Sequence, residues 1–108
     1  MEQLSIIEKK GANYMLLEVT GNLNTYTYTE LQTKIVTSIK DAEVIVDLSA
    51  VRGISSSGLG SLMVGYEDGE TYGHKLYIMN PSQIVKLAID STGFAEYFPV
   101  IHSVNEVL

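Results

Sequence analysis

Apolar residues along the chain alternate between two spacings, one typical of strands and one typical of helices. The runs LSIIEK (4–9) and YMLLEVTG (14–21) are short and apolar, and the turn-forming stretch KGAN separates them. EVIVDLS (43–49) and KLYIMN (75–80) are two further strand-like runs. The β-branched composition of 43–49 is typical of a central strand that is covered on both faces. We therefore expect a hairpin followed by two more strands.

Helix-like spacing, with apolar residues three and four positions apart, occurs in three segments. The first lies within 25–41, and its stripe is Tyr28, Leu31, Ile35 and Ile39. Thr27 and Glu30 have the spacing of a capping box, in which a hydroxyl and a carboxylate accept hydrogen bonds from backbone amides at the helix start. The sequence therefore predicts a helix capped by Thr27.

The second and third stripes follow the later strands. The second consists of Leu59, Leu62, Met63 and Tyr66, and Gly69 and Gly73 are expected to end or loosen that helix. The third helix is expected to start at Asn80 and Pro81, because proline at the first helical position needs no amide donor. Its predicted stop is Gly93. Its predicted buried stripe is Ile84, Leu87 and Ala88.

The order of these elements predicts the fold class. SVNE (103–106) is a second capping box and predicts a short helix at the C-terminal end. The whole order is β-β-α-β-α-β-α followed by a short tail element. A helix between two strands usually forms a parallel crossover. We therefore predict one α/β domain over residues 1–108, with a mixed four- to five-stranded sheet packed with helices.

Composition narrows the class of function. The net charge is −6, so the surface repels nucleic acid and anionic lipid, and binding to nucleic acid is not expected. There is no cysteine, which excludes disulfides and thiolate metal sites and fits a cytoplasmic protein. No apolar run is long enough to insert into a membrane, and no secretory signal is visible. We expect a monomer, because no long apolar patch is evident.

The stretch ISSSGLGSL (54–62) carries the candidate chemistry. It lies between the carboxyl end of the central strand and the start of a helix, an edge where α/β folds place ligand and interaction sites. Ser55 or Ser56 is expected to cap the helix. One cap does not explain three serines, and the two glycines weaken the first helical turn by about 1 kcal/mol each. Glycines at such a position indicate close approach by another chain or by a neighbouring backbone.

Enzyme and cofactor readings of this stretch are weak. GISSS lacks the final glycine of a nucleophile elbow, and neither His74 nor His102 has a sequence-level link to the serines. A phosphate-binding loop needs a lysine that SGLGSL lacks, and Met63 occupies the third glycine position of a dinucleotide fingerprint. Two distant histidines do not make a metal site. We expect no catalytic residue, no metal and no cofactor.

Phosphorylation is the remaining reading of the serines. A serine at a helix start is exposed, and its phosphorylation adds about two negative charges at neutral pH. The helix dipole tolerates that charge inside the protein. A partner docked on the same edge would face a large local change in charge. Modification could therefore prevent docking without unfolding the domain.

The segment VIVDLSAVRGISSSGLGSL (44–62) resembles the signature of STAS domains, in particular the small bacterial anti-sigma-factor antagonists. In that family an apolar strand ends in Asp-Leu-Ser, and a short link leads to Asp-Ser-Ser/Ala/Thr-Gly-Leu-Gly and an apolar helix. The resemblance covers nearly the whole chain and includes a Gly-x-Leu-Asp-like turn at GNLN (21–24).

The resemblance implies a regulatory binding module rather than an enzyme, acting in transcription regulation. The unmodified antagonist binds an anti-sigma factor that is also a serine kinase of the histidine-kinase-like ATPase fold, which releases the sigma factor. The kinase then phosphorylates the antagonist and breaks the complex, and a PP2C-type phosphatase reverses this. Carried over by position, the phosphoacceptor is Ser56, with Ser57 and Ser55 as alternatives. The implied partner-binding residues are Asn22, Asn24, Ser55, Ser56, Ser57, Gly58, Leu59 and Gly60.

Two positions depart from the family pattern. Ser55 replaces the signature Asp, and Asn24 replaces the acidic residue usual in the earlier loop. Both changes remove negative charge from beside the acceptor. A STAS module in another signalling or transport complex, without phosphorylation, is therefore the alternative reading. The tyrosines of TYTYT (25–29) suit an interface if exposed, although Tyr28 is expected in the core and Tyr26 on the ordinary surface.

Overall fold

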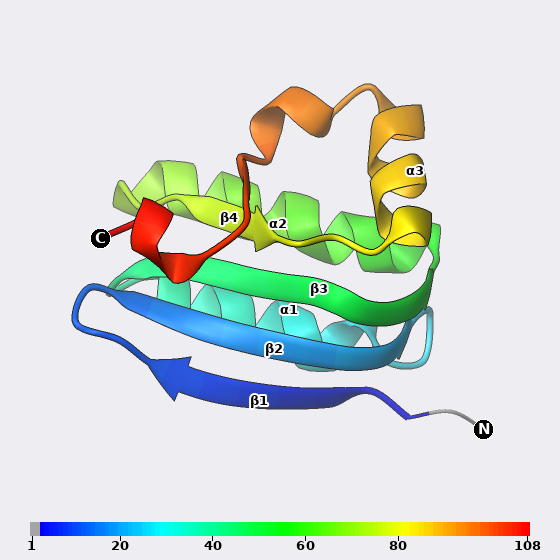
Figure 1. The fold of residues 1–108 in the computed structure, drawn as a ribbon, viewed down its shortest axis with the longest axis horizontal. Coiled ribbons are helices and arrows are strands. Elements are labelled where there is room, and N and C mark those ends of the chain that lie inside the picture. Colours follow the sequence, from blue (N-terminus) through cyan, green and yellow to red (C-terminus); the bar gives the residue numbers. More distant parts are fainter. Residues whose placement is uncertain (1–2) are drawn as a thin grey trace.

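The computed structural model describes residues 3–108 and contains a five-stranded mixed sheet with helices packed on it (Figure 1). The strands are β1 (Ser5–Lys10), β2 (Tyr14–Leu23), β3 (Glu43–Ile54), β4 (Leu76–Met79) and β5 (Val100–Ile101). β1 and β2 form the expected antiparallel hairpin, and every later neighbouring pair is parallel. The strands lie in the sheet in their sequence order. The predicted mixed α/β sheet is confirmed.

Helices connect the parallel strands. They are α1 (Tyr28–Ile39), α2 (Ser56–Tyr72) and α3 (Gln83–Thr92), followed by the 3-10 turns η1 (Ala95–Tyr97) and η2 (Val104–Glu106). In Figure 1, α1 and α2 run side by side behind the sheet, whereas α3 stands at one end of it. The element order β-β-α-β-α-β-α is confirmed, and β5 with η2 forms the tail. No helix within residues 3–108 has the length and apolar character needed to cross a membrane.

The strand β3 is buried on both faces, as its composition predicts. Val44, Val46 and Leu48 join the main core under the helices. Ile45 points to the opposite face and packs in a smaller cluster with Leu16, Met79 and Ile101. Residues of the C-terminal tail, among them Val104 and Val107, cover this second cluster. The predicted SVNE capping box is confirmed on η2, where Glu106 accepts a hydrogen bond from the Ser103 amide at 3.1 Å.

The predicted capping box at Thr27 is wrong. Thr27 does occupy the N-cap position of α1, but its hydroxyl makes no capping hydrogen bond to that helix. Instead, Oγ1 accepts a hydrogen bond from the Asn24 amide at 2.9 Å and donates one to the Asn22 carbonyl at 2.7 Å. The hydroxyl is used to close the loop before the helix, so it is not available to the amides of the first turn. The predicted stripe is nevertheless correct, because Leu31, Ile35 and Ile39 are fully buried.

Helix α2 passes straight through Gly69 and ends at Gly73, which adopts a left-handed conformation. Of the two glycines expected to end or loosen this helix, Gly73 ends it, and Gly69 lies inside it. The buried side of α2 consists of small residues together with Leu62, namely Gly58, Ser61, Leu62, Gly65 and Gly69. Leu59, Met63 and Tyr66, predicted on the core side, are only partly buried at its margin. Small residues allow α2 to lie close to α1 and to the sheet.

Helix α3 begins and packs differently from the prediction. Its N-cap is Ser82, whose Oγ accepts a hydrogen bond from the Val85 amide, so Asn80 and Pro81 precede the helix. The buried residues are Val85 and Ile89, whereas two of the predicted core residues, Ile84 and Leu87, are 47% and 58% exposed. Ala88 is half-buried. Gly93 ends the helix in a left-handed conformation, as predicted.

Candidate docking and modification site

The serines lie at the carboxyl end of the central strand. β3 continues to Ile54, beyond the predicted end at residue 49, and pairs there with the end of β2. The Ser55 amide donates a hydrogen bond to the Leu23 carbonyl at 2.9 Å, which ties the start of α2 to the last residue of β2. The two segments that the family resemblance places together, 22–24 and 55–60, are therefore neighbours in space.

Ser55 is the cap of α2. Its backbone is extended, and its Oγ accepts a hydrogen bond from the Gly58 amide at 3.2 Å. Its carbonyl also accepts the first helical hydrogen bond, from the Leu59 amide. This arrangement satisfies an amide of the first turn that otherwise lacks a partner. Of the two serines that the sequence offers as caps, the structure uses Ser55 and leaves Ser56 without that task.

Ser56 and Ser57 differ in accessibility. Ser56 is the first residue of α2, and its side chain is exposed. The Ser56 hydroxyl makes no hydrogen bond with any residue of 3–108. Ser57 is half-buried, and its Oγ lies 3.5 Å from the Thr25 Oγ1. The Ser55 hydroxyl is occupied by the cap. A reagent or an enzyme approaching this edge therefore meets the Ser56 hydroxyl first.

Asn24 organises the loop beside the serines. Its Oδ1 accepts a hydrogen bond from the Tyr26 amide at 2.9 Å, and its own amide donates to Thr27. A hydrogen bond from the backbone amide of a residue to the side-chain oxygen of an Asp or Asn two residues earlier defines an Asx turn. Tyr26 follows with 80% of its side chain exposed, and Tyr28 packs against the core, as predicted.

The two departures from the family pattern therefore have the same physical character. Ser55 caps a helix and Asn24 closes an Asx turn, and aspartate is also a preferred residue for either task. Both side chains are neutral, so neither adds a negative charge beside Ser56. An aspartate at either position would make the electrostatic potential of this edge more negative. With the neutral side chains, the partial positive charge of the α2 N-terminus is less compensated.

The two glycines of Gly-Leu-Gly have different surroundings. A Cβ on Gly58 would lie 2.6 Å from the Leu23 carbonyl oxygen, so this glycine is required by the chain's own packing. A Cβ on Gly60 would have no heavy atom within 4 Å. Glycine inside a helix costs about 1 kcal/mol relative to alanine. Nothing within residues 3–108 accounts for that cost at Gly60, which presents bare helix backbone to the outside.

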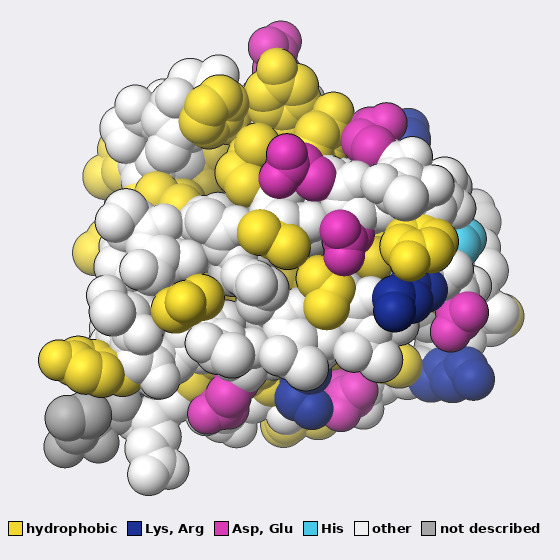
Figure 2. All heavy atoms as spheres, turned by 180° about the vertical axis from the view of Figure 1, so that it is seen from behind, with side chains coloured by type: hydrophobic (Ala, Val, Ile, Leu, Met, Phe, Trp, Pro, Cys, Tyr) yellow, Lys and Arg dark blue, Asp and Glu magenta, His cyan; other side chains and the backbone are white. Residues whose placement is uncertain are grey.

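An apolar groove begins beside Ser56. It has a volume of about 250 Å³, and its walls combine the first turns of α2 with the end of α3 and the η1 segment. The lining residues are Ser56, Leu59, Gly60, Met63, Thr92, Phe94 and Phe98. The aromatic ring of Phe98 packs edge-on against Tyr66 of α2, with centroids 6.3 Å apart, and so holds the η1 segment over the helix. Figure 2, which views the molecule from behind, shows hydrophobic side chains gathered toward the top, with acidic side chains among them.

The predicted site residues differ in how far they are exposed at this edge. Ser56 is exposed, Asn22, Asn24 and Gly60 are half-buried, and Gly58 is buried. Sequence reasoning missed the aromatic wall of Phe94 and Phe98. That wall comes from a segment without strand or helix periodicity, so only its apolar composition could have indicated it.

The titratable groups of residues 3–108 do not form a metal site. No group of three or more His, Asp and Glu side chains is placed to hold a metal ion there. His74 contacts the Ile39 carbonyl and His102 contacts Asn80, so the two histidines lie in separate places away from the serines. Further along α2, desolvation and then the nearby Glu70 carboxylate raise the pKa of Tyr66, which stays neutral at physiological pH.

Solved structures with the same fold cover nearly all of this chain. An anti-sigma-factor antagonist (STAS) domain protein from Planctomyces limnophilus has a TM-score of 0.81 at 16% identity, over 94% of this chain and 93% of its own. An anti-sigma factor antagonist from Mycobacterium paratuberculosis has a TM-score of 0.79 at 22% identity, over 96% and 90%. The phosphorylated form of the Bacillus cell fate determinant SpoIIAA has 0.74 at 15% identity, over 95% and 96%.

These likenesses lie below 25% identity, so they show the fold. The family is shown by the sequence, because the model of the STAS domain matches residues 3–107. The match includes the hairpin, the loop with Asn24, the serine edge and the later strands and helices. This chain belongs to the STAS domain family.

Proposed function

We propose that this protein is an anti-sigma factor antagonist whose docking edge is switched by phosphorylation of Ser56. Its partner is an anti-sigma factor that is also a serine kinase of the histidine-kinase-like ATPase fold. Docking of the unmodified protein releases the sigma factor, and transfer of a phosphoryl group to Ser56 ends the interaction. A PP2C-type phosphatase restores the unmodified form. The protein acts in this scheme as a cytoplasmic regulatory module and not as an enzyme.

One observation carries this proposal, namely that Ser56 is exposed at the first position of α2 while Ser55 supplies the cap. A serine that only stabilised the helix would occupy the cap position, as Ser55 does. Ser56 instead stands free beside the bare backbone of Gly60 and the apolar groove. Such an arrangement suits a hydroxyl that is presented to a partner.

The charge balance supports a switch that acts on the partner and leaves the fold intact. A phosphoserine adds about two negative charges at neutral pH, directly at a helix N-terminus. The unpaired amides and the dipole of α2 favour that charge, and the neutral Ser55 and Asn24 do not repel it. A kinase surface packed against the same residues would have to bury the new charge, which costs several kcal/mol if it stays unpaired.

The other two serines are weaker acceptors for physical reasons. The Ser55 Oγ is held against the Gly58 amide as the cap of α2, so it is less available to a kinase than the exposed Ser56 hydroxyl. Modification of Ser57 would place the phosphate in a half-buried position beside Thr25. Ser56 is the position at which the modification disturbs nothing inside the domain.

The test is a pull-down from native lysate of the source cells, with the wild-type chain and Ser56→Glu as baits and the captured proteins identified by mass spectrometry. Thr71→Glu is the matched control, because Thr71 is exposed at the opposite end of the same helix and the added charge is equal. We expect a protein with a serine-kinase ATPase domain and anti-sigma activity on wild type and on Thr71→Glu. We expect its loss on Ser56→Glu, by about 30-fold or more in affinity.

Two other results would change the proposal. Equal capture on all three baits would keep a docking role and remove the switch at Ser56. Capture of transport components or of a different signalling assembly would favour a STAS module in another complex, without phosphorylation. That alternative draws its support from the two lost charges at Ser55 and Asn24.

A further inference from the structure

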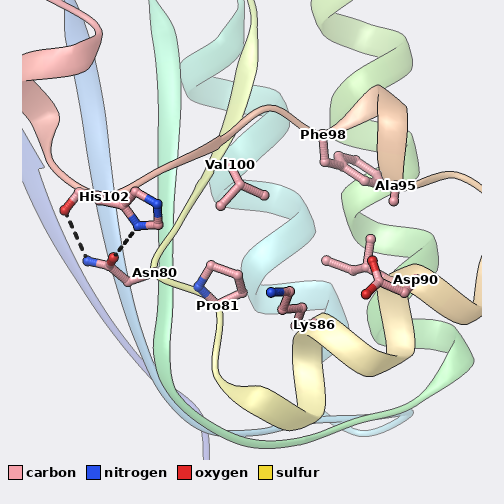
Figure 3. Close-up of a pocket in the computed structure, with 9 residues that line it drawn as sticks. Asn80, Pro81, Lys86, Asp90, Ala95, Phe98, Val100 and His102 are labelled. Carbon is pink, nitrogen blue, oxygen red and sulfur yellow. Dashed lines mark hydrogen bonds between the residues drawn. The ribbon is translucent and has the colours of Figure 1, made fainter.

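A second cavity lies away from the serine edge, outside the carboxyl end of β4. Its volume is about 290 Å³, and it is framed by the end of β4, by α3, by the η1 segment and by the tail after β5 (Figure 3). The crevice beyond the carboxyl ends of parallel strands is where α/β sheets bind small ligands. The volume is near the lower limit of pockets that hold small molecules. The cavity shares Phe98 with the groove beside Ser56 and no other lining residue.

Two opposite charges on α3 face this cavity. Lys86 and Asp90 are four residues apart, so they lie one turn apart on the same side of the helix. Figure 3 shows both side chains directed toward the cavity. Neither forms an ion pair with the other or with any residue of 3–108. The cavity therefore presents an unpaired cation and an unpaired anion to whatever enters it.

The opposite rim is held in place by hydrogen bonds. Asn80 has a left-handed backbone with φ of 47°, which is uncommon for a residue with a side chain. Its amide donates to the Ile101 carbonyl at 3.0 Å, and its Nδ2 donates to the His102 carbonyl at 3.3 Å. Because Nδ2 is the donor, Oδ1 is left to accept from the His102 Nδ1 at 3.3 Å. The pair forms a fixed polar wall facing α3 (Figure 3).

Between these polar rims the cavity is apolar. Ile89 and Phe98 are 5% and 4% exposed and belong to the main core, so they form a firm floor. Val100 also lines the cavity, and it leaves 51% of its side chain open to solvent. An apolar ligand group placed here would cover Val100 and pack against the Phe98 ring. Covering such apolar surface favours binding.

We propose that this cavity binds an apolar α-amino acid in its zwitterionic form. The ligand carboxylate pairs with Lys86, the ligand ammonium group pairs with Asp90, and the aliphatic or aromatic side chain packs on Ile89, Phe98 and Val100. A molecule that carries a carboxylate alone leaves Asp90 facing an anion, and a simple amine leaves Lys86 facing a cation. The paired charges on one helix therefore select a ligand that carries both. This site does not depend on the switch at Ser56.

The test is a titration of the full chain, labelled in its methyl groups, with L-leucine and L-phenylalanine, followed by NMR. 4-Methylpentanoate and 3-methylbutylamine are the comparison ligands, because each keeps the apolar group of leucine and only one of its charges. We expect saturable shifts of the Ile89 and Val100 methyl signals with the amino acids, and binding weaker by about tenfold for each comparison ligand.

Variants test the charge assignment. Lys86→Gln and Asp90→Asn remove one partner each and are exposed, so the fold is retained. We expect either to weaken amino-acid binding by about tenfold. Lys40→Gln and Asp41→Asn, exposed at the end of α1, are the matched controls and should bind as wild type does. The proposal is overturned if neither amino acid shifts Ile89 and Val100 at millimolar concentration, if the single-charge ligands bind equally well, or if both cavity variants bind like wild type.

Discussion

The glycines of α2 serve two different purposes. In the second half of the helix, a Cβ on Gly65 would lie 2.5 Å from the Ile35 Cγ2, and a Cβ on Gly69 would meet the His74 carbonyl oxygen. In the first half, Gly58 is equally confined, whereas Gly60 faces open space. Glycines 58, 65 and 69 therefore serve the packing of this chain. Gly60 weakens the helix, and no packing contact within the described residues requires a glycine there.

This contrast separates the requirements of the fold from those of the docking edge. A position required by the fold resists an added methyl group because something already fills the space. A position required by a partner accepts the methyl group in the free protein and rejects it in the complex. Stability and binding should therefore respond in opposite directions at the two kinds of glycine.

Gly69→Ala should give the largest loss of stability among the single changes considered. The new methyl group meets the His74 backbone, which cannot rotate away, and overpacking of this kind typically costs about 1–3 kcal/mol. The gain in helix propensity offsets about 1 kcal/mol of that cost. We expect the free energy of unfolding in urea to fall by up to about 2 kcal/mol. An increase would show that the close approach at Gly69 is not tight.

Ser55→Ala should destabilise the domain by about 1 kcal/mol, because the Gly58 amide loses its cap. Ser55→Asp should retain the cap and restore the charge that the family pattern has. We therefore expect near wild-type unfolding in urea for the aspartate variant and a clear loss for the alanine variant. Equal stability of the two would contradict the assignment of Ser55 as the cap.

Gly60→Ala should stabilise the free protein by up to about 1 kcal/mol, since the methyl group meets nothing and helix propensity improves. The same change should weaken docking to the captured anti-sigma factor by about tenfold, because the partner's close approach to the backbone is lost. Urea unfolding and titration calorimetry measure the two effects. Unchanged affinity would place Gly60 outside the interface.

A phosphoserine in place of Ser56 should raise the stability of the free domain slightly, by about 0.5 kcal/mol, through the α2 dipole. The gain should shrink in Ser55→Asp, where a second negative charge lies beside the phosphate, and it should shrink at high salt. Thermal unfolding of protein with genetically encoded phosphoserine measures this. A phosphorylated domain that unfolds more readily would mean that the modification acts on the fold itself.

The fold could be predicted because its strands and α1 have one-sided or two-sided apolar patterns that admit one arrangement. Helix α3 was predicted less well for a physical reason. It is apolar at 84, 85, 87, 88 and 89, so the spacing fits two opposite faces. Packing on β3 selects Val85 and Ile89 and leaves Ile84 and Leu87 outside. The choice is made by tertiary contacts, which a single helix pattern does not contain.

The candidate site divides in the same way. The serine edge is continuous in sequence, so its place between strand and helix could be predicted. The choice of Ser55 over Ser56 as the cap required the backbone geometry at the end of β3. The groove required α2 and the segment around Phe94 and Phe98 to meet, which no local pattern encodes. At Thr27 the sequence has the spacing of a capping box, but the hydroxyl instead donates a hydrogen bond to the Asn22 carbonyl in the preceding segment.

The central claim is that Ser56 is the residue on this edge that a partner kinase modifies. The most direct measurement incubates the chain with the captured kinase and ATP. The phosphate is localised by fragmentation of the tryptic peptide 53–75, which contains Ser55, Ser56 and Ser57. We predict a single phosphate on Ser56, and none on the Ser56→Ala variant. A phosphate on Ser55 or Ser57 of the wild-type chain, or unchanged incorporation in Ser56→Ala, would contradict the account.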